Sequence, residues 1–255
     1  MKEPLNVVWS RDCDLDSVST ITVKCDKAGR WFISLLCESR VEEKPITGKT
    51  VGIDLGVKDA VVLSDGEKLN PDRRAQRKNE ERIKRCQKEL SRKQKGSQNW
   101  EKARLKLSRA YARYTDTKRD WLHKTTTYLV DTYDVICIED LNVSGMTRKV
   151  SEKGRSAKSG LNRGILGNNL SEFRSMLEYK SDWYGRECIA INRYYPSSKR
   201  CSKCGYINQE LTLNDRRWTC SSCGAHHDRD INAARNIKAA GLAVVACGDS
   251  VRLDS

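Results

Sequence analysis

Four cysteines constrain the fold of this chain more than any other feature. They form two close pairs in the pattern Cys201-x2-Cys204-x15-Cys220-x2-Cys223. Two such pairs at this separation match tetrahedral zinc coordination by four thiolates. Because four thiolates leave no open coordination position, the pattern predicts a structural zinc ribbon over residues 196–226. A redox pair is the alternative use of these thiols, and His226 and His227 are alternative ligands, although four cysteines already satisfy the metal.

The other seven cysteines stand singly, and together with the four they make an odd count of eleven. An odd count in a chain without an evident secretion signal argues against a disulfide framework. No run of residues approaches the roughly 18 apolar residues of a membrane span. We therefore expect a cytoplasmic protein without a membrane partner, whose remaining cysteines are reduced thiols: Cys13, Cys25, Cys37, Cys86, Cys137, Cys188 and Cys247.

The formal net charge of +14 is concentrated in one segment. Residues 71–124 hold 19 Lys and Arg against 7 Asp and Glu, a net charge of +12. Such a segment favours nucleic-acid binding, because neutralised phosphates release condensed counterions; a solvated helical face is the alternative. Helical spacing of apolar residues predicts two helices, about 75–93 and 98–132, paired as a hairpin. The candidate phosphate contacts on this basic arm (residues 71–132) are Arg73, Arg74, Arg77, Lys78, Arg85, Lys93, Lys95 and Arg104.

Around the arm the chain alternates between strand and helix patterns. Strands are expected at 6–9, 19–23, 31–36, 50–56, 60–63, 135–139 and 187–193, where β-branched, aromatic and aliphatic residues gather. Helices are expected at 169–185 and from Arg229 to about Ala240, where Gly241 ends the last one. Residues 144–168 are rich in Gly, Ser, Lys and Arg and predict a mobile loop. The order predicts an α/β fold.

Three acids stand at the ends of regular elements. Asp54 and Glu139 each end an apolar strand, and Asp230 lies in the first turn of the last helix. Asp230 shares a helix face with Ala234 and Ile237, so we expect it to point toward the sheet, with Asp228 as the helix cap. Carboxylates brought together repel unless cations separate them, and Mg²⁺ or Mn²⁺ suits such ligands in two-metal phosphodiester cleavage. Each acid alone is more simply a strand-end or capping residue.

The chain also carries family motifs. In order, Gly52-Ile53-Asp54-Leu55-Gly56-Val57, Ile138-Glu139-Asp140-Leu141-Asn142, the cysteine pairs and residues 227–237 resemble TnpB proteins, the OrfB-type transposon-encoded RNA-guided nucleases. Residues 91–97, 176–180 and 196–200 are similar as well. The resemblance implies a RuvC-like catalytic triad of Asp54, Glu139 and Asp230. It also implies that a guide RNA pairs with the target DNA that the protein cleaves.

This resemblance implies a RuvC/RNase H-like mixed sheet with flanking helices, an inserted basic helical hairpin, an inserted zinc ribbon and a short N-terminal β segment. The expected domains are a partial wedge-like β-barrel at 1–43, a nuclease core at 50–195, the ribbon, a last core helix at 227–245 and a tail at 246–255. Family members have a longer N-terminal part, so we expect an N-terminally truncated protein, with the missing module possible in trans.

Two other functions stay open. The chain is alternatively a catalytically weak or inactive nucleic-acid-binding protein, such as a guide-directed binder or a decayed transposase remnant. The presence of all three acids favours the nuclease, since a binding protein has no need of them. A recombinase is a third possibility, but the chain shows no separate motif for strand transfer.

Overall fold

The computed structural model describes residues 6–10, 12–141, 162, 167, 169–212 and 214–246. The chain divides into two compact units. One combines residues 1–42 with 75–116, and the other combines residues 43–74 with 117–255. Within the described residues, no helix is both long and apolar enough to cross a membrane. The predicted mobile loop at 144–168, apart from residues 162 and 167, and the predicted tail beyond Ala246 lie outside the described residues.

A five-stranded mixed sheet organises the second unit. Its strand order is β5-β4-β3-β6-β7. The central strand β3 pairs antiparallel with β4 and parallel with β6, and β6 pairs parallel with β7. The strands are β3 (Thr50–Leu55), β4 (Val61–Leu63), β5 (Lys68–Leu69), β6 (Val135–Glu139) and β7 (Glu187–Ile191). Because β3 and β6 are parallel neighbours, their carboxyl ends meet at one edge of the sheet.

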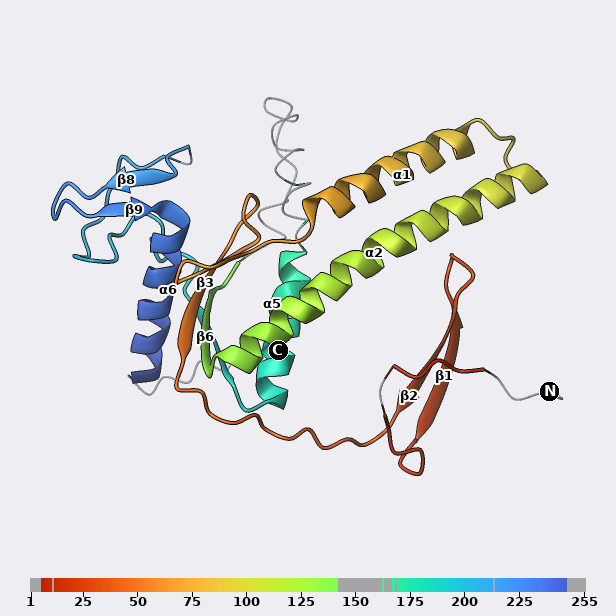
Figure 1. Ribbon diagram of the computed structural model, residues 1–255, viewed down its shortest axis with the longest axis horizontal. Helices are drawn as coiled ribbons and strands as arrows, with labels where there is room; N and C mark the ends of the chain where they lie inside the picture. Colours follow the sequence, from red (N-terminus) through yellow and green to blue (C-terminus); the bar gives the residue numbers. More distant parts are fainter. Residues whose placement is uncertain are drawn as a thin grey trace. The chain divides into compact units, whose positions relative to one another are not determined.

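Helices cover both faces of this sheet. Alternate strand residues, such as Ile53 and Ile138, pack with α5 (Leu170–Trp183) and the end of α2 (Gln98–Thr132) in the main core. Their neighbours Cys137 and Ile191 pack on the opposite face against Ile237 of α6 (Arg229–Ala246). This alternation follows from the two-residue period of strands. The unit therefore has three layers, with α6 alone on its face among the described helices (Figure 1).

The last helix runs further than the sequence indicates. We expected Gly241 to end it, but α6 continues to Ala246. A Cβ at Gly241 would lie 2.3 Å from Sγ of Cys137, so glycine here permits close helix–sheet packing instead of a chain reversal. The prediction of a helix end at Gly241 was therefore wrong, because its packing against β6 is not visible in a local pattern.

The first unit contains a β-hairpin and most of a helical hairpin. Strands β1 (Thr20–Cys25) and β2 (Trp31–Leu36) pair antiparallel across the turn at residues 26–30. Helix α1 (Arg73–Ser91) packs Ile83 and Cys86 against Ala110 of α2, which confirms the predicted helical pairing. Residues 6–9 form no strand, contrary to expectation, and Val8 is 93% exposed. Their apolar side chains find no strand partner among the described residues.

Candidate functional site

The four predicted zinc ligands lie together at the knuckles of the ribbon. All four Sγ atoms of Cys201, Cys204, Cys220 and Cys223 are within 4.8 Å of one another. Cys201 lies 3.7 Å from Cys223 and Cys204 lies 3.6 Å from Cys220, Sγ to Sγ. Tetrahedral Zn–S bonds of about 2.3 Å place sulfurs about 3.8 Å apart. The donor set therefore fits a tetrahedral zinc ion.

Two matching turns build this cluster. Gly205 and Gly224 follow the two pairs with φ of +80° and +69°, which glycine adopts without strain. Their N–H groups donate to the carbonyls of Cys201 and Cys220, at 2.9 and 2.8 Å. The second turn is framed by β8 (Arg217–Thr219) and β9 (His226–Asp228), an antiparallel pair. Both knuckles thus have the same local geometry.

Backbone and histidine contacts adjust the thiols. The backbone N–H of Tyr206 holds the pKa of Cys204 at about 6, which favours the thiolate that a metal requires. His227 places Nε2 3.1 Å from Sγ of Cys201 and stacks on Trp218. His227 therefore contacts one sulfur of the cluster without belonging to the group of four.

The three predicted acids lie toward the face of the sheet that α6 covers, although among the described residues they do not form the close cluster of side chains that the four cysteines form. Asp54 follows Gly52 by two residues, and Asp230 precedes Ala234 by one helical turn. A Cβ at Gly52 would lie 2.1 Å from the carbonyl oxygen of Ala234, so strand and helix touch there. Two strand residues and four helix residues each advance about 6–7 Å, which brings Asp54 opposite Asp230. Glu139 continues the register in which Ile53 pairs with Ile138.

The electrostatics of these acids agree with that placement. Burial, with the negative charges of Glu139 and Asp230, raises the pKa of Asp54 to about 8. Burial also raises the pKa of Glu139, while the hydrogen bond from the hydroxyl of Ser197 acts in the opposite direction and lowers it. The charges of Glu139 and Asp230 thus oppose the ionisation of Asp54, and a divalent cation between such carboxylates would relieve this repulsion. Asp54, Glu139 and Asp230 could hold Mg²⁺ or Mn²⁺ at this edge.

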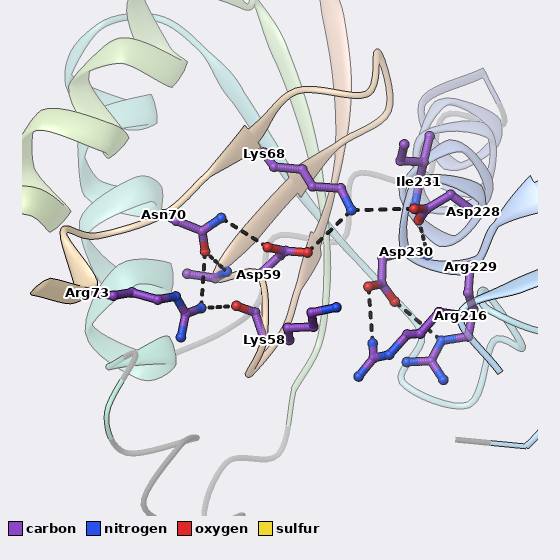
Figure 2. A network of polar contacts seen from close by, with 11 residues as sticks. Lys58, Asp59, Lys68, Asn70, Arg73, Arg216, Asp228, Arg229, Asp230 and Ile231 are labelled. Carbon is purple, nitrogen blue, oxygen red and sulfur yellow. Dashed lines mark hydrogen bonds and ion pairs between the residues drawn. The ribbon is translucent and has the colours of Figure 1, made fainter. Parts of the chain in front are cut away.

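Two arginines that the sequence did not single out flank Asp230. Arg216 approaches Oδ2 of Asp230 at 3.2 Å, and Arg229 approaches Oδ1 at 3.3 Å. Arg216 lies in the ribbon, directly before β8, and its side chain is half exposed, whereas the side chain of Arg229 is mostly buried. Figure 2 shows both guanidinium groups turned toward the carboxylate. They balance the charge of Asp230 in the structure.

Asp228 has the capping role that the sequence predicted. Its Oδ1 accepts the backbone N–H groups of Asp230 and Ile231, at 3.1 and 3.2 Å. Its Oδ2 lies 3.5 Å from Nζ of Lys68, which also approaches Asp59 at 3.3 Å (Figure 2). Lys68 thus links the loop after β3 to the start of α6. No local pattern marks Lys68 for this role, because its partners are 9 and 160 residues away.

The predicted nucleic-acid contacts are all exposed, but two of them have protein partners. Arg73 donates to the carbonyl of Lys58 and to Asn70, and Arg104 pairs with Glu101 at 2.7 Å. The other six are exposed side chains: Arg74, Arg77, Lys78, Arg85, Lys93 and Lys95. Lys78 and Arg85 are exposed on α1, whose buried residues are Ile83 and Cys86.

Sequence comparison places these motifs in a family. Residues 33–150 match the OrfB_IS605 model, described as "Probable transposase", and residues 171–237 match the model described as "Cas12f1-like, TNB domain". A Streptomyces pristinaespiralis protein, named as a proposed RNA-guided DNA endonuclease, is 49% identical over 252 residues. The match covers 98% of this chain and 60% of that protein. The chain belongs to the OrfB/TnpB family.

A second OrfB/TnpB relative gives the same result. Escherichia coli K12 InsQ, also named as a proposed RNA-guided DNA endonuclease, is 41% identical over 243 residues, covering 92% of this chain and 60% of InsQ. The chain thus spans about 60% of the length of these relatives. A solved Cas12f1–sgRNA–target DNA complex has a TM-score of 0.58 at 20% identity, covering 87% of this chain and 45% of that one. This likeness confirms the predicted mixed α/β fold.

Proposed function

We propose that this chain contains the nuclease centre of an RNA-guided DNA endonuclease, with Asp54, Glu139 and Asp230 as its catalytic carboxylates. The observation that carries the proposal is the backbone contact between Gly52 and Ala234. This contact brings Asp54 opposite Asp230. Burial, together with the charges of Glu139 and Asp230, raises the pKa of Asp54. Bringing carboxylates together against their mutual repulsion costs free energy unless a cation binds between them.

The residues divide the chemistry between them. Divalent cations, when bound, supply activation of the attacking water and stabilisation of the leaving oxygen. Asp54, Glu139 and Asp230 hold the cations, with Mg²⁺ or Mn²⁺ as the fitting ions. Arg216 and Arg229 balance the charge of Asp230. The four cysteines hold a structural zinc, and the ribbon they fold precedes the helix that carries Asp230.

Guide RNA and target DNA are the proposed partners. The two named relatives support this class of activity, as does the fold shared with Cas12f1. The exposed cations of the basic arm contact the nucleic-acid backbone with little base preference. Because the chain spans about 60% of its relatives, guided cleavage is proposed for a protein of their full length. Asp54, Glu139 and Asp230 supply the hydrolytic centre. The part of the relatives that this chain does not match is supplied in the same chain or in trans.

A binding protein without cleavage is the second candidate. The observation that favours it is the pairing of Asp230 with both Arg216 and Arg229, which gives this acid a structural partner without any metal. In that case the chain would bind nucleic acid through its basic arm and leave phosphodiesters intact.

A matched pair of variants separates the two functions. The chain and its Asp54→Asn variant are incubated with labelled single-stranded DNA and an RNA–DNA duplex, in Mg²⁺, Mn²⁺ or EDTA. We expect cation-dependent cleavage that Asp54→Asn reduces by at least about 100-fold, because cation-assisted stabilisation is worth several kcal/mol. Binding should stay within about 2-fold, since the arm is unchanged.

The same assay is repeated with the N-terminal part of the Streptomyces relative supplied in trans, with guide RNA and plasmid target. The nuclease is supported if the chain cleaves, with or without that part, and if Asp54→Asn abolishes the cleavage. Equal binding with no cleavage in either format, while the full Streptomyces relative cleaves, supports the binding protein.

A further inference from the structure

Glu139 receives a hydrogen bond from a buried serine outside the predicted triad. The hydroxyl of Ser197 donates to Oε1 of Glu139, and Ser197 is 7% exposed. Its position lies 58 residues beyond Glu139 in the chain, at the start of the zinc ribbon and four residues before Cys201. A single donor on Oε1 fixes the rotation of the carboxylate and leaves Oε2 available to another ligand.

Helix α6 holds this serine in place. Asn236 donates from Nδ2 to the carbonyl of Ser197 at 2.8 Å and to the carbonyl of Arg200 at 2.6 Å. Asn236 is 4% exposed, so these bonds form inside the protein. Buried carbonyls without a donor are costly, and this amide therefore determines where Ser197 lies.

A second asparagine extends the connection to the zinc cluster. Asn232, one turn before Asn236, donates to the carbonyl of Arg200 at 2.7 Å and accepts the N–H of Ser202 at 2.9 Å. Ser202 lies between the ligands Cys201 and Cys204. Residues 197–202 are thus fastened to the helix that carries Asp230, with Glu139 at one end and the first zinc knuckle at the other.

We propose that Ser197 is a positioning residue that orients Glu139 for cation binding, and that Asn232 and Asn236 tie this orientation to the zinc ribbon. The inference rests on the proposed nuclease function, because it assigns Glu139 a cation. Hydrogen-bond partners of metal ligands typically contribute 10- to 100-fold to metal affinity or activity. A hydroxyl that only filled space beside Glu139 would contribute nothing to cation affinity.

The test measures Mn²⁺ binding directly, by electron paramagnetic resonance of free Mn²⁺, on the zinc-loaded chain. The variants are Ser197→Ala, Ser197→Thr and Asp54→Asn. Ser198→Ala is the matched control, since Ser198 is the adjacent serine and its side chain makes no hydrogen bond within the described part of the chain. Zinc content and the thermal midpoint are measured for each variant to show that the ribbon and fold are intact.

We expect Ser197→Ala to raise the Kd for Mn²⁺ about 10-fold. Ser197→Thr, which keeps the hydroxyl, should stay within about 3-fold of the parent, and Ser198→Ala should match the parent. Cleavage with saturating Mn²⁺ should recover in Ser197→Ala more fully than in Asp54→Asn.

The outcomes separate the two proposals. If Asp54→Asn lowers Mn²⁺ affinity but Ser197→Ala does not, the role of Ser197 is wrong and the carboxylate site stands. If the parent and Asp54→Asn bind Mn²⁺ equally, the proposed nuclease site fails, and the positioning role fails with it.

Discussion

Gly52 of β3 and Ala234 of α6 touch backbone to backbone, so that a Cβ on Gly52 would lie 2.1 Å from the carbonyl oxygen of Ala234. This contact sets the distance between the strand that carries Asp54 and the helix that begins near Asp230. It also explains why the strand tolerates a glycine that has no side chain to pack.

Gly52→Ala should therefore destabilise the fold by about 1–3 kcal/mol, the usual cost of overpacking. The added methyl meets backbone atoms of Ala234 and Lys238, which cannot move as a flexible side chain can. The free energy of unfolding in urea measures the effect. Ala239→Ser, on the exposed side of α6, should change it by less than about 0.5 kcal/mol. Equal stability of Gly52→Ala and the parent would contradict this close contact.

The ribbon should hold one zinc ion per chain, measurable by elemental analysis of the purified protein. Cys204→Ser should lose most of that zinc and unfold the ribbon, because structural zinc contributes roughly 10–16 kcal/mol of apparent binding free energy. Cys25→Ser is the control, since Cys25 is an exposed thiol in β1 and should leave the zinc content unchanged. A parent protein without zinc would refute the assignment of the four cysteines.

The carboxylates should differ sharply from the capping acid beside them. Glu139→Ala and Asp230→Ala should each abolish cation-dependent cleavage while nucleic-acid binding remains. Asp228→Ala should retain cleavage and lose about 1 kcal/mol of stability, the usual cost of a missing helix cap. Cleavage assays and urea denaturation on the same preparations give both quantities. If Asp228→Ala were inactive and Asp230→Ala active, the catalytic carboxylate of this helix would be Asp228 and not Asp230.

Binding by the basic arm should weaken steeply with salt. Each phosphate contact contributes about 0.7–0.9 to the slope of log K against log salt concentration. Charge reversal at Arg85, Lys93 and Arg104 should flatten that slope, with Arg85 and Lys93 contributing more than Arg104, which already pairs with Glu101. Fluorescence anisotropy with labelled RNA–DNA duplex at several salt concentrations measures the slopes. Unchanged slopes in all three variants would remove the arm from the interface.

Lys180 should make stability depend on pH. Its Nζ is buried against the carbonyl of His123 and the hydroxyls of Thr126 and Thr127, at 2.7–2.9 Å. Burial lowers the pKa of Lys180 from 10.5 to about 8. Between about pH 8 and 10.5 the unfolded chain holds a proton that the folded chain has released, so stability from this group rises with pH.

The measurement compares the parent with Lys180→Met in urea at pH 7.5 and pH 10. The stability of the parent relative to the variant should increase at the higher pH, because methionine has no proton to release. Other groups titrate equally in both proteins and cancel in the difference. Parallel pH dependence in the two proteins would show that Lys180 keeps its ordinary pKa.

Local sequence patterns determined most elements of this protein and its four-cysteine cluster, which could hold a metal ion. The spacing of Cys201, Cys204, Cys220 and Cys223 is itself a geometric constraint, so the pattern identified the cluster that the structure contains. The helical face shared by Asp230 and Ala234 likewise follows from a period of 3.6 residues, and the capping role of Asp228 from its place before the helix.

Only the tertiary structure decided which distant groups meet. Ser197 contacts Glu139 across 58 residues, and Lys68 contacts Asp228 across 160, distances at which no periodicity operates. Gly241 resembles a helix end in sequence but continues the helix, because it fits against Cys137 on another strand. Residues 6–9 have strand composition but form no strand, since a strand requires a hydrogen-bonding partner that composition does not supply.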